Sequence, residues 1–210
     1  MKKYFFFFCF ILTLSLYAQK EYYEIRTYSI PFNGSEQALH NYLEKALLPA
    51  LNRHGVENIG VFEGLGDPTP KQIILIVPHK NILSYGMVIN GLATDSKYLE
   101  KRKFYDLLPH DKHVYTRFSS SFYIAFDGHP KIIKPEKGSQ LFELRTYEGY
   151  SEDAVRRKVK MFNEEELAIF DATGLHSVFF GEQVSGPLMP ALTYMLSFNS
   201  MEERNANWAK

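Results

Sequence analysis

The chain has 210 residues, of which 45% are hydrophobic and 23% are charged, and its 24 basic residues balance its 24 acidic residues. This length predicts one large domain or two small ones, and the composition is that of a folded soluble protein. The zero net charge, with no basic block after the first few residues, excludes the electrostatic pattern of a nucleic-acid-binding protein, so no nucleic-acid partner is predicted.

The first 18 residues have the features of a leader. Met1-Lys2-Lys3 precedes an almost wholly apolar run from Tyr4 to Tyr17, and Ala18 stands at the expected cleavage position. This pattern is typical of a secretory signal peptide and predicts export to the periplasm or the exterior. A membrane anchor is the alternative, but about 14 apolar residues fall short of the ~20 that a spanning helix needs. Cleavage would remove Cys9, the single cysteine, and would leave no disulfide and no stable membrane span.

The segment after the leader predicts a strand followed by a helix. Tyr22 to Ile30 alternates between two sets of side chains, which is typical of a strand. Ser35 is the predicted N-cap of a helix that ends at His54-Gly55. Pro49 is expected to kink or divide this helix, because proline has no amide hydrogen to donate to the preceding turn.

The pattern continues with two strands, a helical region and a further strand. The strands are predicted at 58–64 and 72–77, the helical region at 81–108 with a break near Thr94-Asp95, and the last strand at 120–126. The resulting order is β-α-β-β-α-β, which is that of a ferredoxin-like unit.

The chain then repeats itself. The hexamer at 23–28 returns 119 positions later at 142–147, with four identical residues and two apolar exchanges. Strands are predicted again at 140–148, 176–181 and 192–198, and Ser151 and Ser200 are predicted N-caps. An internal duplication explains this series. We therefore predict a signal peptide (1–18), a first ferredoxin-like domain (19–127), a linker (128–139) and a second domain (140–210).

The second copy has no counterpart of the strand at 120–126, because that counterpart would lie 119 positions further on. Folded proteins avoid an unpaired sheet edge. We expect that the sequence is a fragment of a longer chain; the alternative is that another segment covers the edge.

The repeated strand carries the candidate site. We expect its apolar residues to face the helices of each unit, and its polar residues to meet inside a barrel made of two sheets packed face to face. These polar candidates are Glu24, Arg26, Tyr28, Glu143, Arg145 and Tyr147. One interpretation is a buried ion-pair network between the sheets, since buried charges must be paired. The other is a pocket in which an arginine binds the carboxylate or enolate of a small substrate.

Four histidines are weaker candidates. His54 ends a helix and His176 begins a strand, and both are retained as lower-ranked ligand-binding residues. His110 and His113 have a spacing that can bind a metal, but no third ligand lies near them. The sequence therefore predicts no metal site and no cofactor.

The two E-x-R-x-Y strands, the helix that ends at His54-Gly55, the Gly/Pro-rich hairpin and the segment 200–204 together resemble NIPSNAP domains. The resemblance covers nearly all of the chain after the leader. It implies tandem ferredoxin-like units in a barrel of the dimeric α+β barrel superfamily, and it supplies no established catalytic residues. We expect a small-ligand-binding or protein-interaction module that can form a homo-oligomer. The alternative is an oxygenase- or isomerase-like enzyme with a pocket in the barrel, because related barrel families include monooxygenases.

Overall fold

The computed structural model describes residues 19–112 and 114–210, so the predicted leader and His113 lie outside the described residues. Seven strands in this part of the chain form one sheet in the order β2-β3-β1-β4-β6-β7-β5. Every neighbouring pair is antiparallel. The strands are β1 (Tyr22–Ile30), β2 (Gly60–Glu63), β3 (Lys71–His79), β4 (Arg117–Ala125), β5 (Leu141–Glu148), β6 (His176–Ser185) and β7 (Ala191–Phe198).

The helices flank this sheet. The first half contains α1 (Glu36–Tyr42), η1 (Leu43–Leu47), α2 (Leu48–Arg53), α3 (Ile82–Thr94), α4 (Ser96–Asp106) and η2 (His110–Lys112). The second half contains α5 (Glu152–Met161), η3 (Phe162–Glu166), α6 (Leu167–Thr173) and α7 (Met201–Trp208). None of these described helices is long and apolar enough to cross a membrane.

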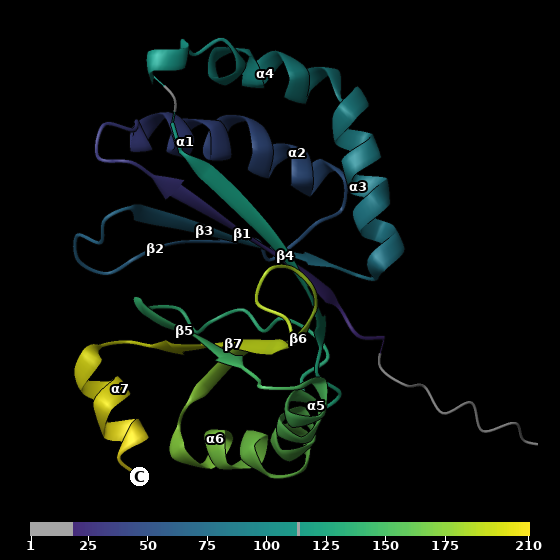
Figure 1. Ribbon diagram of the computed structural model, residues 1–210, viewed down its shortest axis with the longest axis vertical. Helices are drawn as coiled ribbons and strands as arrows, with labels where there is room; N and C mark the ends of the chain where they lie inside the picture. The colour runs from purple at the N-terminus through teal and green to yellow at the C-terminus, as the bar shows by residue number, and fades with distance from the viewer. Residues whose placement is uncertain (1–18, 113) are drawn as a thin grey trace, which may run out of the picture.

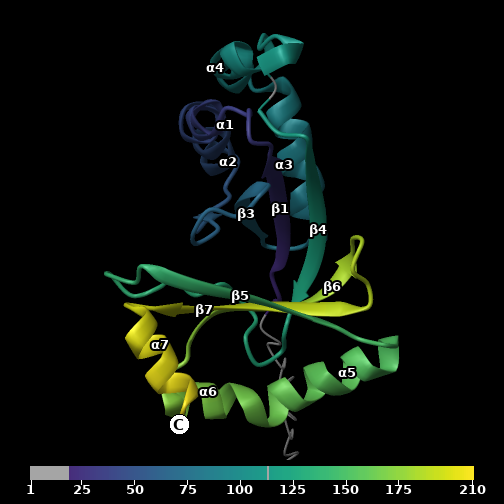
Figure 2. The same ribbon diagram turned by 60° about the vertical axis from the view of Figure 1, so that its left-hand side comes forward.

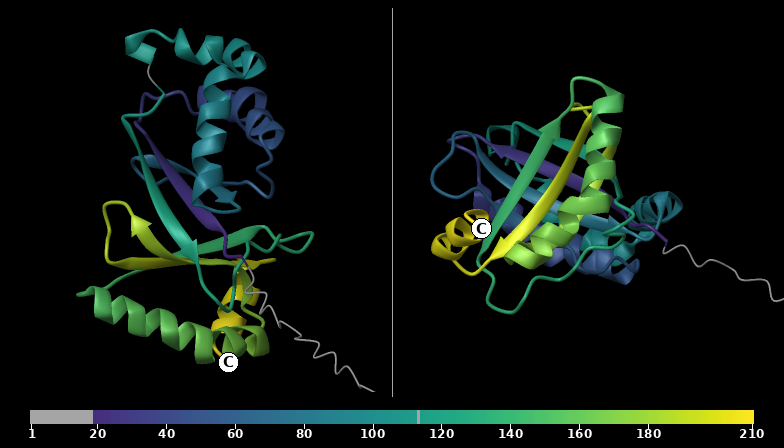
Figure 3. Two further views of the ribbon diagram at one scale, coloured as in Figure 1. Left: turned by 90° about the vertical axis from the view of Figure 1, so that its right-hand side faces the viewer. Right: turned by 90° about the horizontal axis from the view of Figure 1, so that it is seen from below.

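The sheet curls so that its two halves face each other (Figure 1). Helices α1–α4 cover the outer side of β1–β4, and α5–α7 cover the outer side of β5–β7 (Figures 1 and 2). The strands of the two halves cross when the molecule is seen from below (Figure 3). Apolar side chains fill each helix–sheet contact and also line the space between the two halves.

One strand joins the halves. β4 pairs with β1 over Arg117–Ile124 and with β6 over Phe122–Ala125. Our expectation of two separate sheets packed face to face was therefore wrong in this respect, because pairing with β6 covers the edge that β4 would otherwise leave open. The two ends of the single sheet are β2 and β5.

The predicted helix ends are confirmed. The Ser35, Ser151 and Ser200 side chains each accept a hydrogen bond from the backbone amide three residues later. Gly55 and Gly174 follow the corresponding helices with φ values of 78° and 76°, in the left-handed region that glycine adopts without strain.

The long helix of each half contains one π-helical segment, η1 in the first copy and η3 in the second. The two segments lie 119 positions apart, as the hexamers do. Pro49 follows η1, but the second copy has Ala168 at the equivalent position. Pro49 alone therefore does not explain the π-helical segment, because the segment occurs in both copies and the proline in only one.

The faces of the repeated strand are the reverse of our expectation. The apolar residues Tyr23, Ile25, Phe142 and Leu144 face the space between the two halves, where they belong to an interior cluster. Its other members are Phe62, Ile74, Ile76, Tyr123, Ala125, Ile132, Val178, Phe179 and Met195. Both faces of the sheet are covered, one by helices and the other by the opposite half. The alternation of residues therefore separates two sets of side chains, but it does not indicate which set faces the helices.

Candidate functional site

A cleft of about 1080 Å³ opens between β2 and β5, the two ends of the curled sheet. Its walls are mainly apolar and include Val61, Phe62, Ile74, Phe142, Leu144 and Met195. The rings of Phe62 and Phe142 meet edge to face across it, with centroids 5.0 Å apart. Ligand pockets are commonly about 300–1,000 Å³ and are lined by apolar and aromatic side chains, so the cleft can hold a small organic molecule.

Few polar side chains reach this cleft. They are Asn52, Asn58, Glu63, Lys134 and Gln140. No histidine, cysteine, serine, threonine, tyrosine or aspartate occurs among its described lining residues. The amine of Lys134 and the carboxylate of Glu63 are therefore the ionisable groups among the described lining residues.

The first Glu-Arg pair lies on the helix side of the sheet. The Arg26 Nε atom donates to Glu24 Oε1 at 2.7 Å, and its Nη2 atom donates to Oε2 at 2.9 Å. Ser120 of β4 donates a third hydrogen bond to Glu24 Oε1 at 2.6 Å. The side chains of Glu24 and Arg26 are only 3% and 13% exposed. Burial disfavours the charged guanidinium, but the paired carboxylate outweighs it and raises the pKa of Arg26.

His79 lies on the same face, at the end of β3, and is 3% exposed. It packs against Tyr85 and Phe122, with ring centroids 5.3 Å and 6.3 Å away. Neither ring nitrogen has a hydrogen-bond partner among the described residues. Burial lowers the pKa of His79 to about 4; the charge of Glu24 opposes this effect, and that of Arg26 adds to it. The ring is therefore neutral at pH 7, with one donor and one acceptor unused.

The second Glu-Arg pair is arranged differently. Glu143 accepts two hydrogen bonds of 2.9 Å from Arg204 of α7 and one of 3.0 Å from the Trp208 indole. Burial opposes ionisation of Glu143, but these donors outweigh it and hold its pKa below the usual range. Arg145 lies further away, with Nη1 3.6 Å from Glu143, and its guanidinium stacks 4.5 Å from the Trp208 ring centroid.

The six polar candidates therefore do not meet in one interior site. Tyr28 belongs to the helix-side core of the first half, and Tyr147 packs with that of the second half. The structure brings Glu24 together with Arg26, and Glu143 with Arg145 and Arg204, on opposite outer sides of the curled sheet. The reason is that apolar side chains line the space between the halves, whereas partners for charge are available on the helix sides.

The lower-ranked histidines also lie apart from the cleft. The Nε2 atom of His54 is 3.3 Å from Asp95, and the Nε2 atom of His176 is 3.8 Å from Glu203. Neither histidine lines the cleft. Both make local contacts with a carboxylate.

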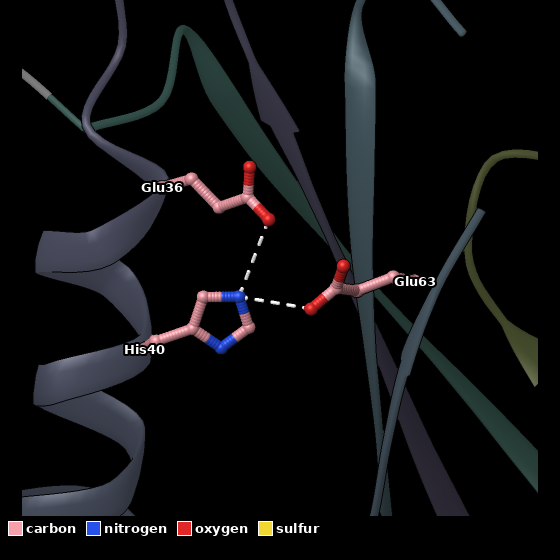
Figure 4. A group of neighbouring side chains, drawn as sticks. All are labelled: Glu36, His40 and Glu63. Atoms are coloured by element: carbon pink, nitrogen blue, oxygen red, sulfur yellow. Dashed lines mark hydrogen bonds and ion pairs between the residues drawn. The ribbon is translucent and has the colours of Figure 1, made fainter. Parts of the chain in front are cut away.

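A cluster that the sequence did not indicate lies near one end of the cleft. The Nε2 atom of His40 lies 3.4 Å from Glu36 Oε1 and 2.9 Å from Glu63 Oε1 (Figure 4). All three side chains could bind a metal ion. The Lys71 ammonium, however, donates to both carboxylate oxygens of Glu36 at 2.7 and 2.8 Å. The group is thus an ion-pair network in which lysine already supplies the cation.

Comparison with known proteins places the fold in a class. No protein-family model matches the sequence, and no curated protein matches it. A candidate monooxygenase from Lactobacillus acidophilus NCFM is similar in structure, with a TM-score of 0.60 and 12% identity over 91% of this chain and 82% of its own. Another, from Fusobacterium nucleatum subsp. nucleatum ATCC 25586, has a TM-score of 0.56 and 8% identity over 92% of this chain and 82% of its own. At these identities the likeness shows the fold alone, which is that of an α+β barrel protein.

Proposed function

We propose that this α+β barrel protein is a binding module that holds a small apolar guest in the cleft between β2 and β5. The observation that carries the proposal is the cleft itself, with its volume of about 1080 Å³ and its facing rings of Phe62 and Phe142. Desolvation of an apolar guest against these walls would contribute about 25 cal/mol per Å² of buried surface. The scarcity of polar lining residues favours binding over catalysis.

We also propose that the protein is an exported member of the NIPSNAP family with two ferredoxin-like units. The repeated E-x-R-x-Y strand supports this proposal, as do the strand orders β2-β3-β1-β4 and β6-β7-β5 in the two halves. In these orders β6, β7 and β5 correspond to β2, β3 and β1. The second half has no described counterpart of β4. The leader pattern of residues 1–18 is the basis for export.

Native mass spectrometry of the purified protein tests the binding proposal. We expect a retained small molecule in the parent and in Phe32→Asp, whose substituted side chain is fully exposed and remote from the cleft lining. Phe142→Asp places a charge in the apolar wall and should lose that molecule. A bare parent protein, or equal retention by both variants, would contradict the proposal.

A second candidate function is an oxygenase- or isomerase-like reaction on the helix side of the first half. It is favoured by one observation, the buried His79 ring with two unused nitrogens beside the Glu24–Arg26 pair. Oxygen uptake in the presence of a panel of phenols tests it. Oxygen uptake that is lost in His79→Phe and kept in Phe142→Asp would favour this enzyme. Absence of oxygen uptake by the parent protein would count against the enzyme and in favour of the binding function.

A further inference from the structure

The connection from β4 to β5 contributes a further wall to the cleft between β2 and β5. Four consecutive residues of this connection line the cleft, and they are Ile132, Ile133, Lys134 and Pro135. Lys134 is the charged residue among them. The connection thus brings one ammonium group to a cleft whose walls are otherwise mainly apolar.

Hydrogen bonds anchor the backbone that precedes this lysine. The Ile132 amide donates to Glu21 Oε2 at 2.8 Å. The Ile133 amide donates to the Val178 carbonyl at 2.8 Å. Ile132 also packs against the interior cluster. Two consecutive amides therefore tie this segment to the body of the protein before any guest binds.

The Lys134 side chain lies on the cleft side of this anchored segment. Pro135 restricts the residue before it to an extended backbone, because the proline ring crowds the helical conformation. In an extended segment, residues two apart face the same side, so Lys134 shares the side of Ile132, and both line the cleft. Lys134 is exposed, whereas Ile132 is half-buried. The aliphatic part of the lysine thus extends the apolar wall, and its ammonium stands at the water-facing rim.

The two ionisable groups of the cleft differ in whether they have partners. Glu63 Oε1 lies 2.9 Å from His40 Nε2, and Glu63 Oε2 lies 3.6 Å from the Lys71 ammonium. Lys134 has no ion-pair or hydrogen-bond partner among the residues that the structure describes. The charge without a partner is therefore positive. An anionic group of a guest can pair with it and displaces no existing contact.

We propose that the guest of the cleft is an amphipathic monocarboxylate, with an apolar body against Phe62 and Phe142 and a carboxylate paired with the Lys134 ammonium. This inference rests on the proposed binding function and names the chemical class of the guest. The described lining residues include no second cation, which favours a single negative charge over a dianion such as a phosphate monoester. At the rim the carboxylate stays in contact with water, so the apolar interior does not have to accept a charge.

Isothermal titration calorimetry with three probes of the same chain length tests the charge of the guest. The probes are decanoate, decanol and decyltrimethylammonium. At neutral pH and low ionic strength we expect the parent to bind decanoate about fivefold more tightly than decanol, because an ion pair is added to the same apolar contact. Decyltrimethylammonium should bind more weakly than decanol. Equal affinities for decanoate and decanol, or tighter binding of the cation, would overturn the inference.

Variants of two lysines test the assignment to one residue. Lys134→Met removes the ammonium and keeps an unbranched apolar side chain, so it should lower the affinity for decanoate to that for decanol and leave the affinity for decanol unchanged. Lys137→Met is the matched control, since Lys137 is an exposed lysine of the same connection that does not line the cleft. It makes the same change in net charge and should keep the preference for decanoate, as should Lys134→Arg. A preference kept in Lys134→Met, or lost equally in Lys137→Met, would overturn the assignment.

The outcomes separate this inference from the binding function on which it rests. If decanol binds to the parent and decanoate binds no more tightly, the cleft still holds an apolar guest and the carboxylate assignment alone fails. If neither decanol nor decanoate binds to the parent, the binding function and this inference fail together.

Discussion

Glu24 and Glu143 occupy equivalent positions in the two copies of the repeated strand, yet they have different arginine partners. Glu24 forms its two-bond ion pair with Arg26, two residues away on the same strand. Glu143 forms its pair with Arg204 of α7, 61 residues away. Arg145, the counterpart of Arg26, therefore does not form the two-bond ion pair and instead stacks on Trp208.

This difference predicts unequal effects of two equivalent substitutions. Arg26→Ala leaves the buried carboxylate of Glu24 without its charge partner and should lower the free energy of unfolding by about 3–5 kcal/mol. Arg145→Ala leaves the Glu143–Arg204 pair intact and removes mainly a cation–π contact, so a loss of about 1 kcal/mol or less is expected. Urea unfolding of both variants checks this, and equal losses would contradict the assignment of partners.

Acidification should weaken the second copy through Glu143. Its pKa is lower in the folded protein than in the unfolded chain, where glutamate has a pKa of about 4.3. A carboxyl of this kind stabilises the fold above about pH 4.3, and this stabilisation is lost as the pH falls through the folded pKa. Glu143→Gln removes the titration, so its stability deficit relative to the parent should shrink between pH 7 and pH 3. A deficit that stays constant over this range, measured by urea unfolding, would argue against the prediction.

His79 should give a separate pH dependence at higher pH. Its pKa is about 4 in the folded protein, whereas that of histidine in an unfolded chain is about 6.5. Below pH 6.5 the unfolded chain binds a proton that the folded protein does not bind, so stability falls as the pH decreases toward 4, by roughly 3 kcal/mol at most. His79→Phe fills the same aromatic contact without the unpartnered nitrogens and should lose this slope. The exposed His176→Gln should keep it, and an unchanged slope in His79→Phe would count against the burial effect.

Lys71 is expected to prevent metal binding at the Glu36–His40–Glu63 cluster, because it holds both carboxylate oxygens of Glu36. Equimolar Zn²⁺ should leave the melting temperature of the parent unchanged. Lys71→Met removes the competing cation and should allow a rise in melting temperature with Zn²⁺, since carboxylate and imidazole groups are zinc ligands. Adding His40→Gln to that variant should abolish the rise. Zinc stabilisation of the parent equal to that of Lys71→Met would show that lysine does not compete.

Much of the fold could be predicted from the sequence, because local chemistry determines it. Alternation located β1, serine N-caps located the helix starts, and the repeated hexamer located the second copy. The orientation of the repeated strand could not be predicted, because both faces of the sheet are covered and neither is marked by solvent. The Glu143–Arg204 pair joins distant segments, and no local pattern indicates it.

The cleft could not be predicted from the sequence, because it depends on the curling of the whole sheet. Phe62 and Phe142 become neighbours only because the sheet curls until its two ends approach. In the sequence they are two apolar residues in different strands. The His40 cluster likewise needs the helix α1 and the strand β2 to be placed together.

The most direct test of binding in the β2–β5 cleft is an equilibrium titration with the uncharged apolar dye N-phenyl-1-naphthylamine, followed by its fluorescence. We expect saturable binding at one site in the parent and in Phe32→Asp, and at least tenfold weaker binding in Phe142→Asp, where a charge stands in the cleft wall. Equal affinities in all three proteins, or no saturable binding by the parent, would contradict the claim that the β2–β5 cleft is the binding site.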